Sequence, residues 1–440
     1  MARTGLAAIR GDHWILGGLG PLLAGLFACG SAEDSRCDAT TTPVLTSAPL
    51  GPADLDVLTG GSGWSERVEA WHAQADGAGG LWLASDVSGP RHSVWLDARG
   101  AVRRGPELAA DEICVVAGVD RLLCASPAQT RLVERDRTLT STAVRGTRPF
   151  VSGSRLGLLT DTELVWLEST TSALVVGSRV RLDRAPQSIQ PDGAGGAWIV
   201  DDGVHPRRLA ADGTLQTVAC GEGGVVETWP GVDDTALAWG ISRDGHWLAR
   251  CDVARGSLWS ARLRVPLDAP VGGGGGLLTT TADEALILVA DGEEHLLLRY
   301  ALADGAFATA RIADPLGPSG LSFGRDPLRF SGAVATVGHD DATFSILYGD
   351  PSGVGVVVRY EVSGARQGEP VRLTSLVHPA IPGDLVGHEG AVWALGETFV
   401  QRVSRSGAPL YHRGRSACTE TDHLFTMQDD GTLSLLGESP

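Results

Sequence analysis

The residues best suited to chemistry lie in two short segments. Asp201 and Asp202 follow the apolar residues 197–200. His388 and Glu389 lie together in a Gly-His-Glu-Gly turn. Imidazoles ligate metals and transfer protons, and carboxylates act as general acids or bases. If the fold brings these four side chains into one funnel, they could support a metal-assisted lyase or hydrolase. The alternative is that they are ordinary exposed turn residues without a catalytic role.

Other catalytic signatures are weak or absent in the sequence. Residues 320–324 read Gly-Leu-Ser-Phe-Gly, the pattern of a nucleophile elbow. That motif needs a strand, a sharp turn and a helix, whereas these residues lie in a Gly/Pro-rich stretch with no helical pattern after them. The sequence has no phosphate-binding loop, dinucleotide fingerprint, calcium loop or zinc-site spacing. We therefore expect no cofactor and no resident metal.

The charge of the chain excludes nucleic acid as a partner. Its 440 residues carry a formal charge of −17, and its 36 basic residues, all arginines, are dispersed among 53 acidic ones. Nucleic-acid backbones attract clustered positive charge, which this sequence does not have. Because the sequence contains no asparagine, N-linked glycosylation is excluded as well.

The first 28 residues have the pattern of a secretory signal peptide. Two arginines precede an apolar run from Trp14 to Ala28, which is shorter than the ~20 residues that a membrane-spanning helix needs. The end of this run, Leu-Phe-Ala-Cys at 26–29, resembles the lipobox of bacterial lipoproteins. The resemblance implies cleavage before Cys29 and lipidation of its thiol. Cleavage nearby by a general signal peptidase is the alternative.

The residues after the cysteine predict the location and the domain boundary. Gly30 stands where lipoproteins of the inner membrane commonly carry aspartate, so the resemblance implies an outer-membrane lipoprotein of the cell envelope. Several acyl chains would give a stable membrane anchor. Residues 29–52 are small and polar, as expected of a lipidated cysteine followed by a flexible tether. The folded domain is expected over residues 53–440.

The six remaining cysteines are an even number in a compartment that permits disulfides. The expected pairs are Cys114–Cys124, Cys37–Cys418 and Cys220–Cys251. The first two cysteines lie at equal distances from the centre of a predicted hairpin and would face each other across its strands. The second pair would join the ends of the domain, and the third follows by elimination. The alternative is that some cysteines stay buried as small apolar side chains.

One phrase occurs twice, as ADGAGGLWLASD at 75–86 and as PDGAGGAWIVDD at 191–202. Degenerate equivalents of its apolar strand recur along the chain, and many are followed by a second strand and an Asp-Gly or Ser-Gly turn. They are DRLLCAS (120–126), RLGLLTDTELVWL (155–167), TALAWG (235–240), ALILVA (285–290), TFSILYG (343–349), AVWALG (391–396) and HLFTMQ (423–428). Three or four short strands in each unit are the pattern of a propeller blade.

The phrase resembles the Asp-Gly-x-Gly-x-h-Trp-h repeat (h, hydrophobic) of bacterial β-propellers of the NHL and sensor type. Residues 76–83 and 192–199 match it well, and 389–394 match it weakly. The resemblance implies an all-β fold, a β-propeller of seven or eight four-stranded blades. The C-terminal segment is expected to be completed by an N-terminal strand such as 53–60, so that the two termini close the ring. A pair of smaller β domains is the alternative.

The tryptophans of the repeat strands are expected to fill the cores between blades, among them Trp82, Trp198, Trp239 and Trp393. The anchor, the fold and the missing catalytic constellation favour a non-catalytic propeller that binds or scaffolds a protein or glycan of the bacterial envelope. Its other partner would be the membrane, through the lipid anchor. The alternative is a propeller enzyme whose channel-mouth site contains the four residues named first.

Overall fold

The computed structural model describes residues 44–47, 50, 54–55, 58–59, 71–85, 92–146, 148–160, 162–170, 173–201, 205–231, 234–263, 276–291, 294–313, 333–339, 341–349, 355–373, 382–388, 391–396, 399–403, 410–415, 422–427 and 432–438. The chain divides into a short unit, Met1–Thr41, and a large unit, Thr42–Pro440. All described residues belong to the large unit. None of the described helical residues forms a helix long and apolar enough to cross a membrane.

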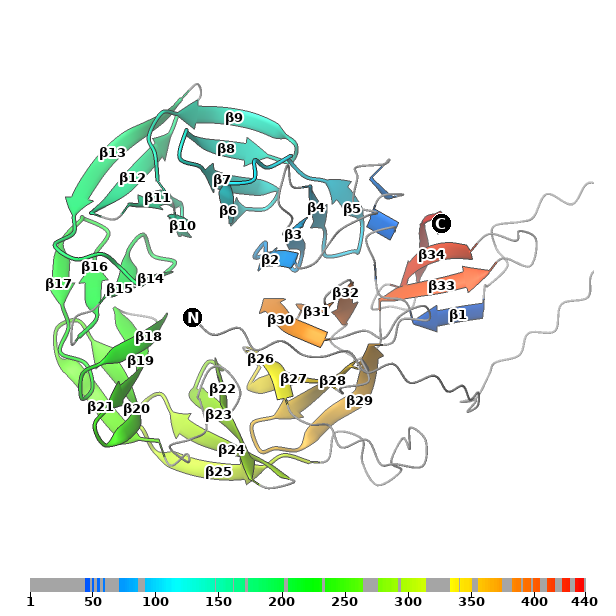
Figure 1. Ribbon diagram of the computed structural model, residues 1–440. Coiled ribbons are helices and arrows are strands. Elements are labelled where there is room, and N and C mark those ends of the chain that lie inside the picture. The colour runs from blue at the N-terminus through cyan, green and yellow to red at the C-terminus, as the bar shows by residue number, and fades with distance from the viewer. Residues whose placement is uncertain are drawn as a thin grey trace, which may run out of the picture. The chain divides into compact units, whose positions relative to one another are not determined.

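The described strands form nine antiparallel sheets, eight of four strands and one of three (Figure 1). Sheet 1 contains β2 (Trp71–Ala75), β3 (Leu81–Ser85), β4 (Ser93–Leu96) and β5 (Val102–Arg104). Sheet 2 contains β6 (Ile113–Gly118), β7 (Arg121–Ala125), β8 (Thr130–Glu134) and β9 (Arg137–Thr142). Sheet 3 contains β10 (Arg148–Ser152), β11 (Arg155–Leu159), β12 (Glu163–Ser169) and β13 (Leu174–Arg181). Sheet 4 contains β14 (Ser188–Pro191), β15 (Ala197–Val200), β16 (Arg207–Leu209) and β17 (Leu215–Thr217).

Sheets 5 to 7 also consist of four strands that follow one another in the sequence, whereas sheet 8 has three strands and sheet 9 includes the N-terminal strand β1. Sheet 5 contains β18 (Val225–Pro230), β19 (Thr235–Ser242), β20 (Gly245–Asp252) and β21 (Gly256–Arg262). Sheet 6 contains β22 (Gly276–Thr280), β23 (Glu284–Asp291), β24 (Glu294–Ala301) and β25 (Phe307–Arg311). Sheet 7 contains β26 (Ala333–Gly338), β27 (Thr343–Gly349), β28 (Gly355–Glu361) and β29 (Arg366–Leu373). Sheet 8 contains β30 (Pro382–His388), β31 (Ala391–Gly396) and β32 (Val400–Val403), and sheet 9 contains β1 (Val44–Ser47), β33 (Tyr411–Arg415), β34 (Asp422–Met427) and β35 (Leu433–Glu438).

The repeated phrase forms the turn between the first two strands of sheets 1 and 4. In sheet 1, Asp76 Oδ1 accepts hydrogen bonds from the backbone N–H groups of Ala78 and Gly80, both at 2.8 Å. Gly79 has a φ of +83°, a conformation that residues with a Cβ rarely adopt. Asp192 heads the equivalent turn of sheet 4. The phrase recurs because this turn needs an acceptor at its head and glycines in its bend.

The strand that follows each of these two turns, β3 or β15, carries a tryptophan into the core shared with another sheet. Trp82 packs with Leu122 and the Cys114–Cys124 pair of sheet 2, and Trp198 packs with residues of sheet 5. Trp82, Trp198, Trp239 and Trp393 are each at most 8% exposed. The prediction that these tryptophans fill the cores between blades is confirmed.

The first strands of most successive sheets lie next to one another. Between sheets 1 and 2, the side chain of Gln74 accepts a hydrogen bond from the N–H of Val116 at 2.9 Å and donates one to the carbonyl of Cys114 at 3.2 Å. Four-stranded antiparallel sheets, joined in sequence and packed face against face with adjoining first strands, define a β-propeller. The expected all-β propeller is therefore present.

Sheet 9 joins the two ends of the large unit. β1 pairs antiparallel with β33, and Leu50 exchanges backbone hydrogen bonds of 2.8 and 2.9 Å with Val400 of sheet 8. The propeller thus has nine blades in its described part, and the prediction of seven or eight was wrong. The nine apolar segments of the sequence each fall in a different sheet, and the last of them, at 423–428, belongs to a full four-stranded blade because β1 and β33 extend its sheet.

The N-terminal strand also differs from the expected one. The strand that pairs with the C-terminal segment is Val44–Ser47, within the predicted tether, whereas residues 54–55 and 58 of the segment 53–60 are helical. Five described residues of the predicted tether, Val44–Ser47 and Leu50, therefore belong to the folded unit. Closure of the ring by this pairing stays a prediction.

Two of the three expected disulfides are present. Cys114 and Cys124 are directly opposite in the β6–β7 pairing, with their Cα atoms 4.0 Å apart. Cys220 and Cys251 are bonded with a Cα separation of 5.5 Å, and both lie in the core between sheets 4 and 5. The remaining cysteines of the predictions, Cys29, Cys37 and Cys418, lie outside the described residues.

Candidate functional site

Asp201 directly follows β15 and is held in ion pairs. Its carboxylate lies 2.7 Å from Arg207 Nη2 and 3.8 Å from Arg184 Nη1. The side chain of Asp201 is only 1% exposed, and that of Arg207 is 8% exposed. A buried carboxylate needs such partners, because leaving it without them would cost several kcal/mol. The cations therefore give Asp201 a structural role.

Arg207 also binds a second acidic residue. Its Nη1 donates to Asp183 Oδ1, in the connection that leads from sheet 3 into sheet 4. A hydrogen bond from its own backbone N–H, together with the positive charge of Arg207, holds the pKa of Asp183 below its usual value. Through Arg207, β16 is tied to the end of β15 and to the connection between sheets 3 and 4.

The other predicted channel-mouth residues are Asp202, His388 and Glu389. Asp202 and Glu389 lie outside the described residues, as does the side chain of His388, whose backbone ends β30. The grouping of these residues with Asp201 stays a prediction. Among the described side chains, no group of three or more His, Cys, Asp and Glu is placed to hold a metal ion.

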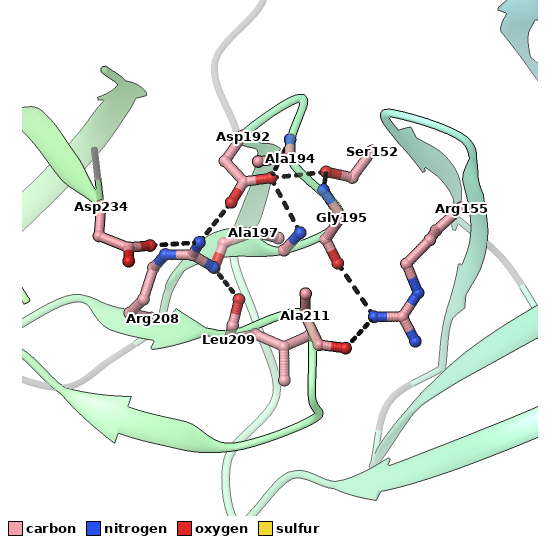
Figure 2. A network of polar contacts seen from close by, with 11 residues as sticks. Ser152, Arg155, Asp192, Ala194, Gly195, Ala197, Arg208, Leu209, Ala211 and Asp234 are labelled. Carbon is pink, nitrogen blue, oxygen red and sulfur yellow. Dashed lines mark hydrogen bonds and ion pairs between the residues drawn. The ribbon is translucent and has the colours of Figure 1, made fainter. Parts of the chain in front are cut away.

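A second charged cluster surrounds Asp192, at the turn formed by the repeated phrase in sheet 4 (Figure 2). Asp192 Oδ1 accepts hydrogen bonds from the backbone N–H groups of Ala194 and Gly196, both at 2.8 Å. The same oxygen accepts a hydrogen bond of 2.7 Å from Ser152 Oγ of sheet 3. Ser152 Oγ in turn accepts from the N–H of Gly195 at 3.0 Å. The turn is therefore bonded to the neighbouring sheet as well as within itself.

Arg208 of β16 neutralises the other oxygen of Asp192. Its Nη2 donates to Asp192 Oδ2 and also lies 2.8 Å from Asp234 Oδ1, in the turn between β18 and β19 of sheet 5 (Figure 2). Its Nη1 donates to the carbonyl of Leu209. The Arg208 and Asp192 side chains are each 6% exposed, whereas Asp234 is largely exposed. One guanidinium group thus links sheets 4 and 5.

Arg155 of β11 completes the cluster from the side of sheet 3. Its Nη1 donates to the carbonyls of Gly195, at 3.1 Å, and of Ala211 (Figure 2). Its guanidinium carbon lies 3.9 Å from the ring centroid of Trp166, a cation–π contact within sheet 3. We call the set Ser152, Arg155, Asp192, Arg208 and Asp234 the Asp192 junction.

The electrostatics of the Asp192 junction keep its carboxylate ionised. Burial by itself would raise the pKa of Asp192. The hydrogen bonds from Ser152, Gly196 and Ala194, with the charge of Arg208, outweigh burial and hold this pKa below its usual value. Such an ionised carboxylate is a poor proton acceptor, so Asp192 serves as a structural anion where sheets 3, 4 and 5 are joined.

The sequence does not predict the Asp192 junction as a unit. Asp192 stands out only as part of the repeated phrase. No sequence pattern marks Asp234 or Arg155 as members, because their partners lie 26 and 40 or more positions away. The dipeptide Arg207-Arg208 was the available signal. Two adjacent arginines in a short strand point to opposite faces, and both are buried here.

Two further histidines lie in the C-terminal strands. His412 lies in β33 and is 8% exposed, and His423 lies in β34. His378 lies outside the described residues, as do residues 320–324 of the nucleophile-elbow pattern. Of the tryptophans outside the predicted repeat strands, Trp229 is partly buried against the core between sheets 5 and 6.

The fold defines the class of this protein as a β-propeller, and the Asp192 junction links three of its neighbouring blades through Ser152, Arg155, Arg208 and Asp234. No protein-family model and no curated protein matches the sequence. Among solved structures, the chain is similar in fold to BamB from Moraxella catarrhalis, at 14% identity over 82% of this chain and 95% of that chain, with a TM-score of 0.46. It is also similar to Sqt1 from Saccharomyces cerevisiae (11% identity, 73% and 93% covered, TM-score 0.45). A third similarity is to virginiamycin B lyase from Staphylococcus aureus, at 11% identity over 81% of this chain and 97% of that chain, with a TM-score of 0.42.

Proposed function

We propose that this protein is a lipid-anchored, extracytoplasmic β-propeller that binds or scaffolds another component of the bacterial envelope without catalysis. The observation that carries the proposal is the ion pairing of Asp201 with Arg207 and Arg184. A general acid or base must offer a proton or a lone pair to the substrate. A buried carboxylate engaged by guanidinium groups is unsuited to that task, and it suits a structural role.

The Asp192 junction supports the same proposal. Its charges are used between sheets, where they fix the turn of sheet 4 against Ser152 and Arg155 on one side and Asp234 on the other. Fixed blades give a surface that loses little conformational entropy when a partner binds. Rigidity of this kind benefits a scaffold as much as an enzyme, and the buried carboxylate of the junction, Asp192, is engaged by Arg208.

Exposed apolar side chains on sheets 3 and 5 are the first candidates for the partner surface. Val226 and Ile241 lie at one end of sheet 5 and are 41% and 49% exposed. Val175 and Val176 lie on β13, the edge strand of sheet 3, and are 40% and 37% exposed. Exposed apolar side chains that adjoin one another are typical of contacts with protein or glycan partners.

Capture from a detergent-solubilised envelope extract tests the scaffold role. The chain from residue 30 onward serves as bait, beside a double Val226→Ser/Ile241→Ser variant and a double Val175→Ser/Val176→Ser variant. We expect one stoichiometric partner that is lost with one double variant and retained with the other, which then serves as the matched control. An extract that yields no stoichiometric partner would contradict the proposal.

The anchor is tested separately by Cys29→Ala. We expect the natural chain in the membrane fraction with an acylated N-terminal cysteine, and the variant in the soluble fraction, because a single residue carries the acyl chains. Cys37→Ala is the matched control and should remain in the membrane fraction. Mass spectrometry that finds an unmodified N-terminus on the mature natural chain would refute the anchor.

A further inference from the structure

A pocket of about 500 Å³ lies between sheets 2 and 3. Residues of β7, β8 and β9 line it on one side, and Ser169 and Thr170, at the end of β12, line it on the other. Pockets of several hundred cubic ångströms hold small molecules about as large as one or two sugar rings. This pocket is separate from the Asp192 junction, whose residues lie in sheets 3, 4 and 5.

The charge of the pocket is opposite to that of the chain. Its charged lining residues are Arg121 and Arg137, with no acidic residue among them, in a protein of formal charge −17. Arg121 pairs with Glu134, with Nη2 and Oε1 2.9 Å apart. The side chain of Arg137 is exposed and forms no ion pair or hydrogen bond with any described residue, whereas its backbone pairs with Glu134 of β8. Its guanidinium group is therefore available to an anionic ligand.

Thr140 contributes a polar atom that lacks a partner. The residue is 7% exposed, it lines the pocket, and its Oγ1 has no hydrogen-bond partner among the described residues. Buried hydroxyl groups are nearly always hydrogen-bonded, because an unpaired one costs about 1–3 kcal/mol. Because the Oγ1 atom is itself buried, a ligand in the pocket would bond to it once the side chain turns toward the pocket.

The pocket also offers an apolar wall and an irregular edge. Leu132 and Leu139 are lining residues, and the β8–β9 pairing shifts register between Leu132 and Val133, which leaves Leu139 as the extra residue of a bulge. Bulges bend a strand away from its neighbour and are frequent beside binding sites. The wall suits the less polar face of a ligand whose charged group lies against the arginines.

We propose that this pocket binds a small molecule that joins an oxyanion, either a carboxylate or a phosphate, to a hydroxylated ring of sugar size. Arg137 contacts the oxyanion, Thr140 hydrogen-bonds a ring hydroxyl, and the ring packs against Leu132 and Leu139. This site goes beyond the scaffold role and does not depend on it, because a captured protein partner need not touch the pocket.

Titration calorimetry with three matched sugars tests the site on the chain from residue 30 onward. Glucuronate and glucose 6-phosphate carry the two oxyanions, and glucose is the neutral control. We expect saturable binding of at least one charged sugar and much weaker binding of glucose. Arg137→Gln should weaken the charged sugar about tenfold or more, the usual effect of losing a hydrogen bond to a charged group. Arg243→Gln, at an exposed arginine in a turn of sheet 5, is the matched control and should leave affinity unchanged.

Thr140→Val separates a ligand role from a structural one. Because Oγ1 has no partner among the described residues, the melting temperature without ligand should hold or rise, while the affinity for the charged sugar falls. A lower melting temperature with unchanged affinity would overturn the role of Thr140. Equal affinities for glucose and both charged sugars, no binding of any of them, or full affinity in Arg137→Gln would overturn the site.

Discussion

Arg208 is the residue on which the Asp192 junction depends, because its guanidinium group faces the carboxylates of both Asp192 and Asp234. We expect Arg208→Met to destabilise the fold by at least about 2 kcal/mol, since it leaves the Asp192 carboxylate buried without its cation. The free energy of unfolding is measured by urea denaturation, followed through tryptophan fluorescence. Arg243→Met, at an exposed turn, is the control and should change it by less than about 0.5 kcal/mol.

A second substitution distinguishes charge from packing at this junction. Asp192→Asn keeps the Oδ1 acceptor that the turn needs and removes the charge. The double variant Arg208→Met/Asp192→Asn should therefore be more stable than Arg208→Met alone. A double variant that is as unstable as the sum of its two single variants would show that the ion pair is not what matters.

His295 of β24 provides a pH dependence. Burial lowers the pKa of its imidazole, which lies against the ring of Tyr348 with the ring centroids 5.7 Å apart. The folded state thus disfavours the protonated ring. Its contribution to stability is complete above the unfolded pKa of about 6.5 and is lost as the pH falls through the lower folded pKa.

We therefore expect the natural chain to lose more stability than His295→Gln when the pH is lowered from neutral to mildly acidic. The free energy of unfolding of both proteins is measured across that range. The other histidines are common to the two chains and cancel in the comparison. Parallel pH profiles would mean that His295 titrates alike in the folded and unfolded states.

The elements of the repeat are specified by local sequence, and the glycines of the Asp192 turn show how. Gly193 has a φ of +72° and open space where a Cβ would lie, whereas a Cβ on Gly196 would meet the backbone oxygen of Leu209. We expect Gly193→Ala to cost about 1 kcal/mol through backbone strain alone. Gly196→Ala should cost about 2 kcal/mol or more, because a backbone atom cannot move aside. Urea unfolding of both variants checks this order, and a larger loss in Gly193→Ala would contradict it.

Strands with an apolar sequence pattern could be predicted, whereas strands without such a pattern could not be predicted. In sheets 1 to 8 the second strand falls on a predicted apolar segment, and in sheet 9 the third strand, β34, does so. By contrast, β33 reads Tyr-His-Arg-Gly-Arg and β1 is only four residues long. β1 obtains its backbone partners from β33, and β33 pairs with both β1 and β34, which no local pattern reveals.

At the scale of the whole molecule, the N-terminal segment bonds to two C-terminal sheets. Leu50 is fully buried and bridges Val400 of sheet 8, while β1 pairs with β33 of sheet 9. We expect a chain that begins at residue 51 to lose at least the ~2 kcal/mol that one buried leucine contributes, with a lower melting temperature. A chain that begins at residue 42 keeps both contacts and is the control. Equal melting temperatures for the two chains would mean that the segment adds nothing to the fold.

The sequence by itself determined most of the strands, their turns, the core tryptophans and the Cys114–Cys124 disulfide. Each of these depends on neighbours within a hairpin or on a repeated pattern, so the information is local. Only the tertiary structure decided that the propeller has nine blades, that Asp201 is held by Arg207, and that Arg208 links Asp192 to Asp234. The physical reason is that these contacts join segments that are far apart in the sequence. Ion pairs between sheets, and the pairing of an N-terminal strand with a C-terminal one, depend on which segments lie side by side in space. No periodic pattern in the sequence predicts that arrangement.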